Sequence, residues 1–273
     1  MKYINSKNNS LIKEVKGLKN KSKERKKKKR FIIEGEKEVF SAIDGGYLIK
    51  KLFTTEEFKN KIIEKIKNKN KDLISNLVVL EKNIFESLCY RSSTSNLIAI
   101  SDFKNHDLNS IRLRKKNPII LILESPEKPG NIGAVLRTVD ASNVDLVLIS
   151  DIKTDLYNPN TIRSSVGCLF NLNIGLGNKK DIIDFLNKTK IELYTTFMNK
   201  KSISYLDVSY KNPVAIVFGN ENMGLSNKWA MLNSKNINIP MLGKNDSLNL
   251  SVSVGIIIYE ALRQRKSHEK LGS

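Results

Sequence analysis

Runs of consecutive apolar residues in the second half of the chain place the strongest constraint on its fold. Residues 118–123 and 214–218 are apolar throughout, which is typical of strands buried on both faces of a parallel sheet. Further strands are predicted at residues 146–149, 192–195 and 237–239, and helices at residues 131–141, 161–166, 180–187 and 251–265. The alternation predicts an α/β domain with a doubly wound parallel sheet over residues 118–273. The last helix is nearly all small or apolar in its first turns, so burial on all sides is expected.

A second, smaller α/β domain is predicted over residues 31–102. Its strands are expected at residues 31–33, 52–55, 77–80 and 97–100, and its helices at residues 36–43, 57–67 and 83–90. The polar residues 103–117 are interpreted as a linker, and residues 1–30 as a basic N-terminal arm or helix. With 273 residues, the chain has the length of two compact domains.

Positive charge is concentrated near the N-terminus. The formal net charge is +19, and residues 13–30 hold 11 Lys and Arg against two Glu, a net of +9. A solvated helix face or a frayed arm is one interpretation, but such faces usually mix charges of both signs. A polyanionic partner is favoured, RNA before an anionic membrane surface, with phosphate contacts that supply affinity rather than sequence readout. The predicted RNA-binding residues are Lys26, Lys27, Lys28, Lys29 and Arg30.

Several functional classes are not expected. Cys89 and Cys168 lie far apart in the sequence, so a disulfide framework is not expected. A reducing, cytoplasmic location is expected instead. No apolar run approaches the roughly 20 residues of a membrane span, and the N-terminus lacks the apolar core of a secretory signal. His106 and His268 have no metal-ligand partners at usable spacing, so no metal is expected.

Three segments of the second half combine glycines or small polar residues with an apolar run. They are residues 131–137 (NIGAVLR), 217–224 (VFGNENMG) and 239–251 (IPMLGKNDSLNLS). A strand followed by a glycine-bracketed loop is where α/β folds bind ligands, and Gly219 is expected to let a ligand approach the backbone. Asn131 is a predicted helix N-cap, and Ser247 is interpreted as a cap, a functional residue or both. Residues 175–177 (GLG) lack the third glycine of a dinucleotide-binding loop.

In this order and spacing, the three segments resemble the motifs of the SpoU/TrmH family of RNA ribose 2′-O-methyltransferases. The resemblance implies S-adenosylmethionine as the cofactor and a ribose 2′-hydroxyl of RNA as the methyl acceptor. It also implies an RNA-binding role for the smaller domain. Finally, it implies a deep C-terminal trefoil knot with residues 239–260 as the threaded piece, which composition and periodicity do not show.

The resemblance also assigns roles to single residues. The catalytic residues that it implies are Asn131, Arg137, Glu221, Ser247 and Asn249. The cofactor-binding residues that it implies are Gly219, Ile239, Met241 and Leu248. Thr195 and Thr196, at the end of a predicted strand, are also expected to line the cofactor pocket. Arg137 is implied to activate the hydroxyl, but an arginine pKa above about 12 makes a grip on the RNA phosphate easier to defend than base catalysis.

Ribosomal RNA, most specifically 23S rRNA, is the favoured substrate, because family members that act on tRNA more often carry short helical extensions than a large N-terminal domain. The alternatives are a tRNA 2′-O-methyltransferase, a non-catalytic RNA-binding protein with the same fold, and a knotted enzyme that methylates a base. An antibiotic-resistance enzyme would have the same layout as a housekeeping one. A homodimer through the C-terminal domain is implied, with residues 251–262 as a candidate interface.

Overall fold

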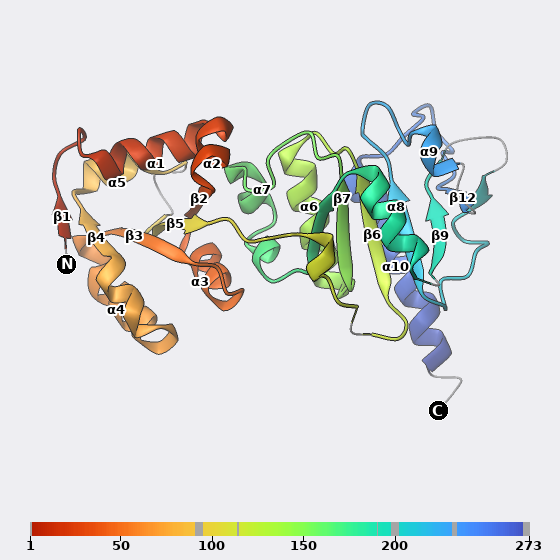
Figure 1. Ribbon diagram of the computed structural model, residues 1–273, viewed down its shortest axis with the longest axis horizontal. Coiled ribbons are helices and arrows are strands. Elements are labelled where there is room, and N and C mark those ends of the chain that lie inside the picture. Colours follow the sequence, from red (N-terminus) through yellow and green to blue (C-terminus); the bar gives the residue numbers. More distant parts are fainter. Residues whose placement is uncertain are drawn as a thin grey trace. The chain divides into compact units, whose positions relative to one another are not determined.

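The computed structural model describes residues 2–90, 95–113, 115–189, 191–197, 202–230 and 234–269 (Figure 1). The chain divides into two compact units. The first comprises Met1–Asn105 and Tyr157–Asn171, and the second comprises His106–Leu156 and Leu172–Ser273. Each unit has its own sheet, so the two α/β arrangements are described separately.

Five strands form the mixed sheet of the first unit, in the order β1-β4-β3-β5-β2. β1, β4 and β3 run parallel to one another, whereas β5 pairs antiparallel with both β3 and β2. The strands are β1 (Lys2–Ile4), β2 (Arg30–Glu34), β3 (Ile49–Thr55), β4 (Leu77–Leu80) and β5 (Ile98–Asp102). The last four correspond to the four strands predicted from the sequence in this region.

Helices cover both faces of this sheet (Figure 1). α1 and α5 lie over one face, where Ile12, Leu18 and Phe85 pack against Phe53 and Val78 of the strands. α3 and α4 lie over the other face. The helices of the first unit are α1 (Ser10–Asn20), α2 (Ser22–Lys28), α3 (Glu36–Asp44), α4 (Glu56–Lys69), α5 (Lys82–Leu88) and α7 (Pro159–Ser164), with short helical turns at Lys71–Asn76 and Cys168–Phe170.

Residues 2–30 are part of the first unit, whereas a separate basic arm or helix was predicted. β1 pairs with β4, and α1 buries Ile12, Val15 and Leu18 completely. Arg25 is also buried, and its guanidinium donates to the carbonyl oxygens of Leu18 (2.7 Å) and Lys19 (3.2 Å) in the last turn of α1. Those carbonyls have no partner within the helix, so Arg25 serves as a C-terminal cap.

Residues 157–171 also belong to the first unit, although the sequence placed them within the domain over residues 118–273. Tyr157 stacks on Phe31 with ring centroids 4.2 Å apart, and Phe170 lies 5.0 Å from Tyr47. The Ser41 hydroxyl donates to the Gly167 carbonyl at 2.8 Å. Offset and edge-on aromatic contacts of this kind stabilise a core beyond the area that they bury.

Seven parallel strands form the sheet of the second unit, in the order β10-β12-β9-β11-β6-β7-β8. The central strands β11, β6 and β7 are buried along their whole length, as their apolar runs predicted. The strands are β6 (Ile119–Glu124), β7 (Leu146–Ser150), β8 (Ile174–Gly177), β9 (Glu192–Thr195), β10 (Ile203–Ser204), β11 (Val214–Phe218) and β12 (Lys235–Asn238). The prediction of an α/β fold with a parallel sheet is therefore confirmed.

The helices of the second unit are α6 (Pro129–Ser142), α8 (Lys179–Asn187), α9 (Asn227–Ala230) and α10 (Leu250–Glu269). α8 covers one face through Ile182 and Leu186, and α6 packs with α10. The expectation that α10 is buried on all sides is wrong, because Val252 is 47% exposed and Tyr259 is 52% exposed. These two residues are seven apart and therefore lie on one face of the helix.

β8 was not predicted, and its glycines explain its form. Gly175 and Gly177 allow the predicted linker to pack on this strand, since a β-carbon on Gly175 would lie 2.8 Å from methyl groups of Leu108 and Leu148. The linker is held there by a hydrogen bond between the His106 ring and the Ile174 carbonyl (3.1 Å) and by a short helical turn at Leu108–Ser110. Residues 106–113 are thus part of the second unit.

Candidate functional site

A cavity of about 490 Å³ lies at the carboxyl ends of β11 and β12 in the second unit. This edge of a parallel sheet is where α/β folds bind ligands, and the volume is that of a small-molecule site. The lining residues are Lys128, Asn131, Thr196, Phe218, Gly219, Asn220, Glu221, Asn222, Gly224, Ile237, Asn238, Ile239, Met241, Asp246, Ser247, Leu248, Asn249, Leu250, Ser253 and Ile257.

Three of the predicted catalytic residues join in one hydrogen-bonded chain beside this cavity. The Asn131 amide donates to Glu221 Oε1 at 2.9 Å, and Asn131 Oδ1 accepts from the Asn249 amide at 3.1 Å. These residues come from α6, from the loop after β11 and from the residue before α10. The structure therefore brings together side chains that lie up to 118 residues apart in the sequence.

Asn131 is free for this role because it is not the N-cap of α6, as the sequence had suggested. Lys128 is the N-cap, and Pro129 occupies the first helical position, where a missing N–H removes nothing from the helix. Asn131 is then the third helical residue. Its side chain points out of the first turn and meets Glu221 instead of the helix backbone.

The loop of residues 219–224 is held by its own backbone and by Asn220. Asn220 donates to the Ser125 carbonyl at 2.7 Å, and its Oδ1 accepts from the backbone N–H groups of Asn222 and Met223 at 2.8 and 3.0 Å. A β-carbon on Gly219 would lie 2.5 Å from the Leu225 nitrogen. Gly219 therefore allows the loop to close on itself. It also lines the cavity, so the close approach of a ligand to its backbone stays a prediction.

Asn249 connects the site to α10. Its Oδ1 accepts from the backbone N–H of Ser251 at 2.9 Å and from the Ser251 hydroxyl at 2.7 Å. This is the geometry of a helix N-cap, so the capping role considered for Ser247 falls to Asn249. Ser247 is exposed and lines the cavity, with Ile239, Met241 and Leu248.

Two predicted site residues do not line the cavity. Arg137 is exposed on α6, two turns beyond Asn131, and the described residues give it no hydrogen-bond or ion-pair partner. Thr195 is buried, and its hydroxyl donates to Asn236 Oδ1 at 2.6 Å, whereas its neighbour Thr196 lines the cavity. Because successive residues of a strand point to opposite sides, only one of the two threonines can face the site.

Sequence reasoning also missed several polar residues of the cavity. Asn220 and Asn222 lie within the second motif but were given no role, and Lys128 directly precedes the first helical turn. Asn238 ends β12 and carries no sequence signal of its own. Their common feature is position, since each follows or ends a secondary-structure element at the same edge of the sheet.

A buried ion pair anchors the far end of the 219–224 loop. Glu124, only 4% exposed, pairs with Lys179 and accepts from the backbone N–H and the hydroxyl of Ser226, both at 2.8 Å. Burial by itself raises the pKa of the Glu124 carboxyl, but the hydrogen bonds from Lys179 and Ser226 outweigh it. The pKa of Glu124 therefore lies below its ordinary value.

The predicted RNA-binding residues lie at the end of α2 and the start of β2 in the first unit. Lys28 pairs with Glu14 at 3.3 Å, and Arg30 pairs with Glu14 at 3.4 Å and with Asp102 at 3.1 Å. Lys26, Lys27 and Lys29 are exposed, and no acidic partner is found for them among the described residues. The unneutralised charge of this segment is thus carried by three of the five residues.

Neither a membrane helix nor a metal cluster is found in the part of the chain that the structure describes. No helix there is long and apolar enough to cross a bilayer. No three His, Cys, Asp or Glu side chains of the described residues lie together as metal ligands would.

The parallel sheet, the cavity at its carboxyl edge and the amide–carboxylate chain beside it are the features of an α/β protein that binds a small molecule. The chain belongs to the SpoU rRNA methylase family, whose model matches residues 118–259. A second model, described as an MRM3-like substrate binding domain, matches residues 9–99. The match from residue 9 onward agrees with the packing of α1 into the first unit.

Relatives of known sequence match along most of the chain. It is 26% identical to the 23S rRNA (guanosine(2553)-2′-O)-methyltransferase RlmP of Bacillus subtilis, over 95% of this chain and 98% of that protein. A putative TrmH family tRNA/rRNA methyltransferase of Staphylococcus epidermidis is 30% identical over 88% of this chain and 98% of its own length. The AdoMet-bound rRNA methyltransferase of Sinorhizobium meliloti has a similar structure, with a TM-score of 0.85, 26% identity and coverage of 96% and 97% of the two chains.

Proposed function

We propose that the protein transfers the methyl group of S-adenosylmethionine to a ribose 2′-hydroxyl of RNA, with 23S ribosomal RNA as the substrate. The observation that carries the proposal is the chain of hydrogen bonds through Asn249, Asn131 and Glu221 at the rim of the 490 Å³ cavity. Membership in the SpoU rRNA methylase family and the 23S rRNA substrate of the Bacillus subtilis relative support it. A cytoplasmic location belongs to the same proposal.

The lining of the cavity suits this methyl donor. Ile237, Ile239 and Leu248 offer apolar surface for the flat adenine ring, and backbone and amide groups of the surrounding loops offer hydrogen bonds to polar atoms. The donor carries a positive sulfonium, and the lining includes the carboxylates of Glu221 and Asp246 against the single ammonium of Lys128. The residues present therefore fit the cofactor in shape and in charge.

The chemistry asks the protein mainly for positioning. S-adenosylmethionine supplies an electrophilic methyl group whose departure leaves a neutral thioether, so no general acid is required. Asn131 and Asn249 are fixed by their mutual hydrogen bond and are positioned to orient the ribose, while Glu221 holds Asn131 and the loop backbone. Holding the acceptor oxygen in line with the methyl group accounts for a large part of such a rate.

Arg137 is assigned to the RNA rather than to proton abstraction. Its guanidinium is exposed and presents a planar fork of N–H donors, so it suits a bidentate grip on the phosphate beside the reactive ribose. Arg137 does not line the cavity of its own chain, and α10 has exposed apolar residues. Both observations support a homodimer through the second unit, in which Arg137 would face the site of the partner. The threading of residues 239–260 as a trefoil knot belongs to the same proposal, and an experimental structure traced continuously through residues 195–269 tests it.

The first test is calorimetric titration with S-adenosylmethionine, followed by transfer of a tritiated methyl group to 23S rRNA and to tRNA. We expect micromolar binding of the donor by the wild type and by Arg137→Ala, and a loss of transfer of about 100-fold in Arg137→Ala. Arg112→Ala, which removes another exposed arginine of the second unit, is the matched control and should transfer at the wild-type rate.

The outcomes separate the proposal from the tRNA and the non-catalytic alternatives. Labelling of tRNA in place of rRNA would establish the tRNA 2′-O-methyltransferase. Absence of heat with the donor, both alone and with RNA present, would leave only an RNA-binding protein. Full transfer by Arg137→Ala would remove Arg137 from the mechanism while leaving the activity in place.

A further inference from the structure

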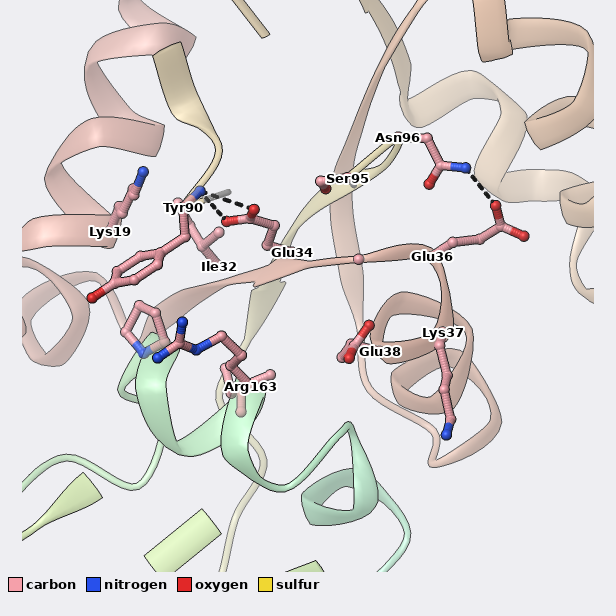
Figure 2. A pocket seen from close by; sticks show the side chains of 13 residues that line it. Lys19, Ile32, Glu34, Glu36, Lys37, Glu38, Tyr90, Ser95, Asn96 and Arg163 are labelled. Atoms are coloured by element: carbon pink, nitrogen blue, oxygen red, sulfur yellow. Dashed lines mark hydrogen bonds between the residues drawn. The ribbon is translucent and has the colours of Figure 1, made fainter. Parts of the chain in front are cut away.

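The first unit contains a second cavity, of about 440 Å³, which the methyl-transfer site does not use (Figure 2). It is built by α1, β2, the start of α3, the residues that flank the loop after α5, and α7, all within the first unit. The lining residues are Lys19, Ile32, Glu34, Gly35, Glu36, Lys37, Glu38, Tyr90, Ser95, Asn96, Pro159, Ile162 and Arg163. Its volume is sufficient for one nucleotide-sized ligand.

One wall of this cavity is an aromatic ring with two cations against it. Tyr90 is 58% exposed, and the Arg163 guanidinium carbon and the Lys19 ammonium lie 4.7 and 5.6 Å from the centre of its ring (Figure 2). Both distances are those of cation–π contacts. An exposed tyrosine with basic neighbours is the combination that single-stranded nucleic-acid sites use for stacking and for phosphate contact.

The parts of this wall are held in place before any ligand binds. Lys19 donates to the carbonyls of Leu88 and Cys89, both at 2.7 Å, and Arg163 donates to Asn160 Oδ1 at 2.7 Å. The Tyr90 backbone N–H donates to both oxygens of Glu34, at 2.7 and 2.9 Å. Such preorganisation lowers the entropy cost of binding.

The opposite wall is acidic. Glu36 is engaged by Lys65 and by Asn96, whose amide donates at 2.7 Å, so it is a fixed part of the wall. Glu38 folds back over Gly35, and a β-carbon on Gly35 would overlap its carboxylate. The glycine therefore makes room for a carboxylate at the cavity, and none of the described residues donates a hydrogen bond to it.

We propose that this cavity holds one unstacked nucleotide of the substrate RNA, with its base on the Tyr90–Arg163 wall and a base amino group donating to Glu38. The proposal rests on the function proposed above and adds a base preference to it. A carboxylate accepts hydrogen bonds, so guanine, adenine and cytosine, which carry amino groups, are favoured. Uracil offers two carbonyl oxygens with a single N–H between them and is disfavoured.

A nucleotide matches the cavity better than a peptide does. An acidic segment would face the carboxylates of Glu34, Glu36 and Glu38, and a basic segment would face Lys19 and Arg163. A nucleotide combines an anionic phosphate with amino donors and a flat face, and each of these has a complement here. The unneutralised lysines of α2 give the same unit a further affinity for RNA.

The test measures binding of GMP, AMP, CMP and UMP to the full-length protein by saturation-transfer NMR and equilibrium dialysis. Saturating S-adenosylhomocysteine is added to keep nucleotides out of the methyl-donor cavity. We expect UMP to bind about 10-fold more weakly than GMP, and Glu38→Ala to remove most of that difference. Tyr90→Ala should weaken all four nucleotides by about 5- to 150-fold.

The chain offers a close control for each variant. Tyr3 is 61% exposed in the same unit, with the Lys59 ammonium 5.6 Å from its ring, but it does not line this cavity. Tyr3→Ala should therefore bind nucleotides as the wild type does, and so should Glu64→Ala, which removes an exposed carboxylate of α4. Thermal unfolding checks that all four variants fold.

Equal binding by Tyr90→Ala and Tyr3→Ala, or equal affinity of the wild type for UMP and GMP, would overturn the proposal. Binding of poly-glutamate or poly-lysine that Tyr90→Ala abolishes, without nucleotide binding, would make the cavity a peptide site and would also overturn it. Binding of S-adenosylmethionine, measured by calorimetry, tests the methyl-donor site independently of the nucleotide measurements. A failure here with intact donor binding refutes the nucleotide site alone.

Discussion

At the scale of single residues, Glu124 shows how a buried charge supports the site without touching it. The carboxylate ends the central strand β6, and through Ser226 it fixes the end of the loop that carries Glu221. Removing one partner of a buried pair costs about 3–5 kcal/mol, because the other charge is left uncompensated. Lys179 is 18% exposed, which places this pair near the lower end of that range.

We expect Glu124→Gln to lower the free energy of unfolding by about 3 kcal/mol at pH 7. The folded pKa of Glu124 is lowered, so its contribution is complete above the ordinary glutamate pKa of about 4.3 and is lost as the pH falls through the folded value. The difference between wild type and variant should therefore shrink below pH about 4.3. Urea unfolding at a series of pH values measures it.

The matched control is Glu192→Gln, which removes the partner of Lys235 in a more exposed pair. Exposed pairs contribute about 0–1 kcal/mol, so this change should be small. An effect of Glu192→Gln as large as that of Glu124→Gln would show that burial is not the cause.

Most residues that line the methyl-donor cavity were predictable because they lie inside contiguous motifs. Asn131, Glu221 and Asn249 were found in this way, but that they bond to one another could not be read from segments separated by 90 or more residues. Thr195 and Thr196 were both expected to line the pocket, because a strand end does not reveal which side of the sheet each residue faces, and only Thr196 does. The exposure of Arg137 depends on how α6 packs and could not be predicted from the sequence either.

At the scale of elements, the glycines of β8 are required by packing. A β-carbon on Gly175 would lie 2.8 Å from side chains of Leu108 and Leu148, and overpacking of this kind costs about 1–3 kcal/mol. We therefore expect Gly175→Ala to lower the melting temperature of the second unit, as calorimetry would show.

Gly17→Ala in α1 is the contrasting change. A β-carbon there meets only Glu24 Cγ at 3.8 Å, an ordinary contact, and alanine is better than glycine inside a helix by about 0.5–1 kcal/mol. Gly17→Ala should stabilise the first unit. If both substitutions shift stability in the same direction, the packing argument for β8 is wrong.

α10 carries the next prediction at this scale. Its exposed Val252 and Tyr259 form one face, which is the interface of the homodimer proposed above. We expect Val252→Asp with Tyr259→Asp to halve the mass measured by sedimentation equilibrium. Leu48→Asp changes a residue of the first unit that is 59% exposed and should leave the mass unchanged.

For residues 1–30, a basic arm or helix was predicted, but the packing of α1 into the core of the first unit was not. The apolar residues 12, 15 and 18 of α1 follow helical spacing, but they are interleaved with lysines, so the charge of the segment dominated its interpretation. In contrast, β6, β9 and β11 were predicted almost to the residue, since strands buried on both faces need no partner information to be recognised.

At the scale of the whole molecule, the net charge of +19 predicts a steep salt dependence of RNA binding. Replacing Lys26, Lys27 and Lys29 by Gln should lower the slope of log K against log salt by about 2 to 3, since each phosphate contact contributes about 0.7–0.9. Filter binding of 23S rRNA between 50 and about 200 mM salt measures the slope.

A charge-matched control separates direct phosphate contacts of these lysines from the effect of the net charge of the protein. Replacing Lys67, Lys71 and Lys82, which are exposed in the same unit, changes the net charge by the same amount. If this triple variant lowers the slope equally, the lysines around α2 make no particular contact with the RNA.

The division of the chain was predictable only in outline. Two α/β arrangements were expected from the alternation of patterns, but the assignment of residues 157–171 to the first unit was not, because it depends on aromatic side chains more than 100 positions apart. Tyr157 and Phe170 look like ordinary core residues of the second half until their contacts with Phe31 and Tyr47 are seen.

This discontinuity has a consequence for the order of events during synthesis. The aromatic face around Phe31 and Tyr47 stays open to water on the ribosome until Tyr157 and Phe170 emerge. At about 5–20 residues per second, residues 106–171 take about 3 to 13 s to make. Proteolysis of stalled nascent chains should show late protection of this face, and full protection before residue 157 has emerged would contradict the delay. The nascent chain is therefore expected to carry all strands of the first sheet for seconds before the residues that complete the core of that unit have been made.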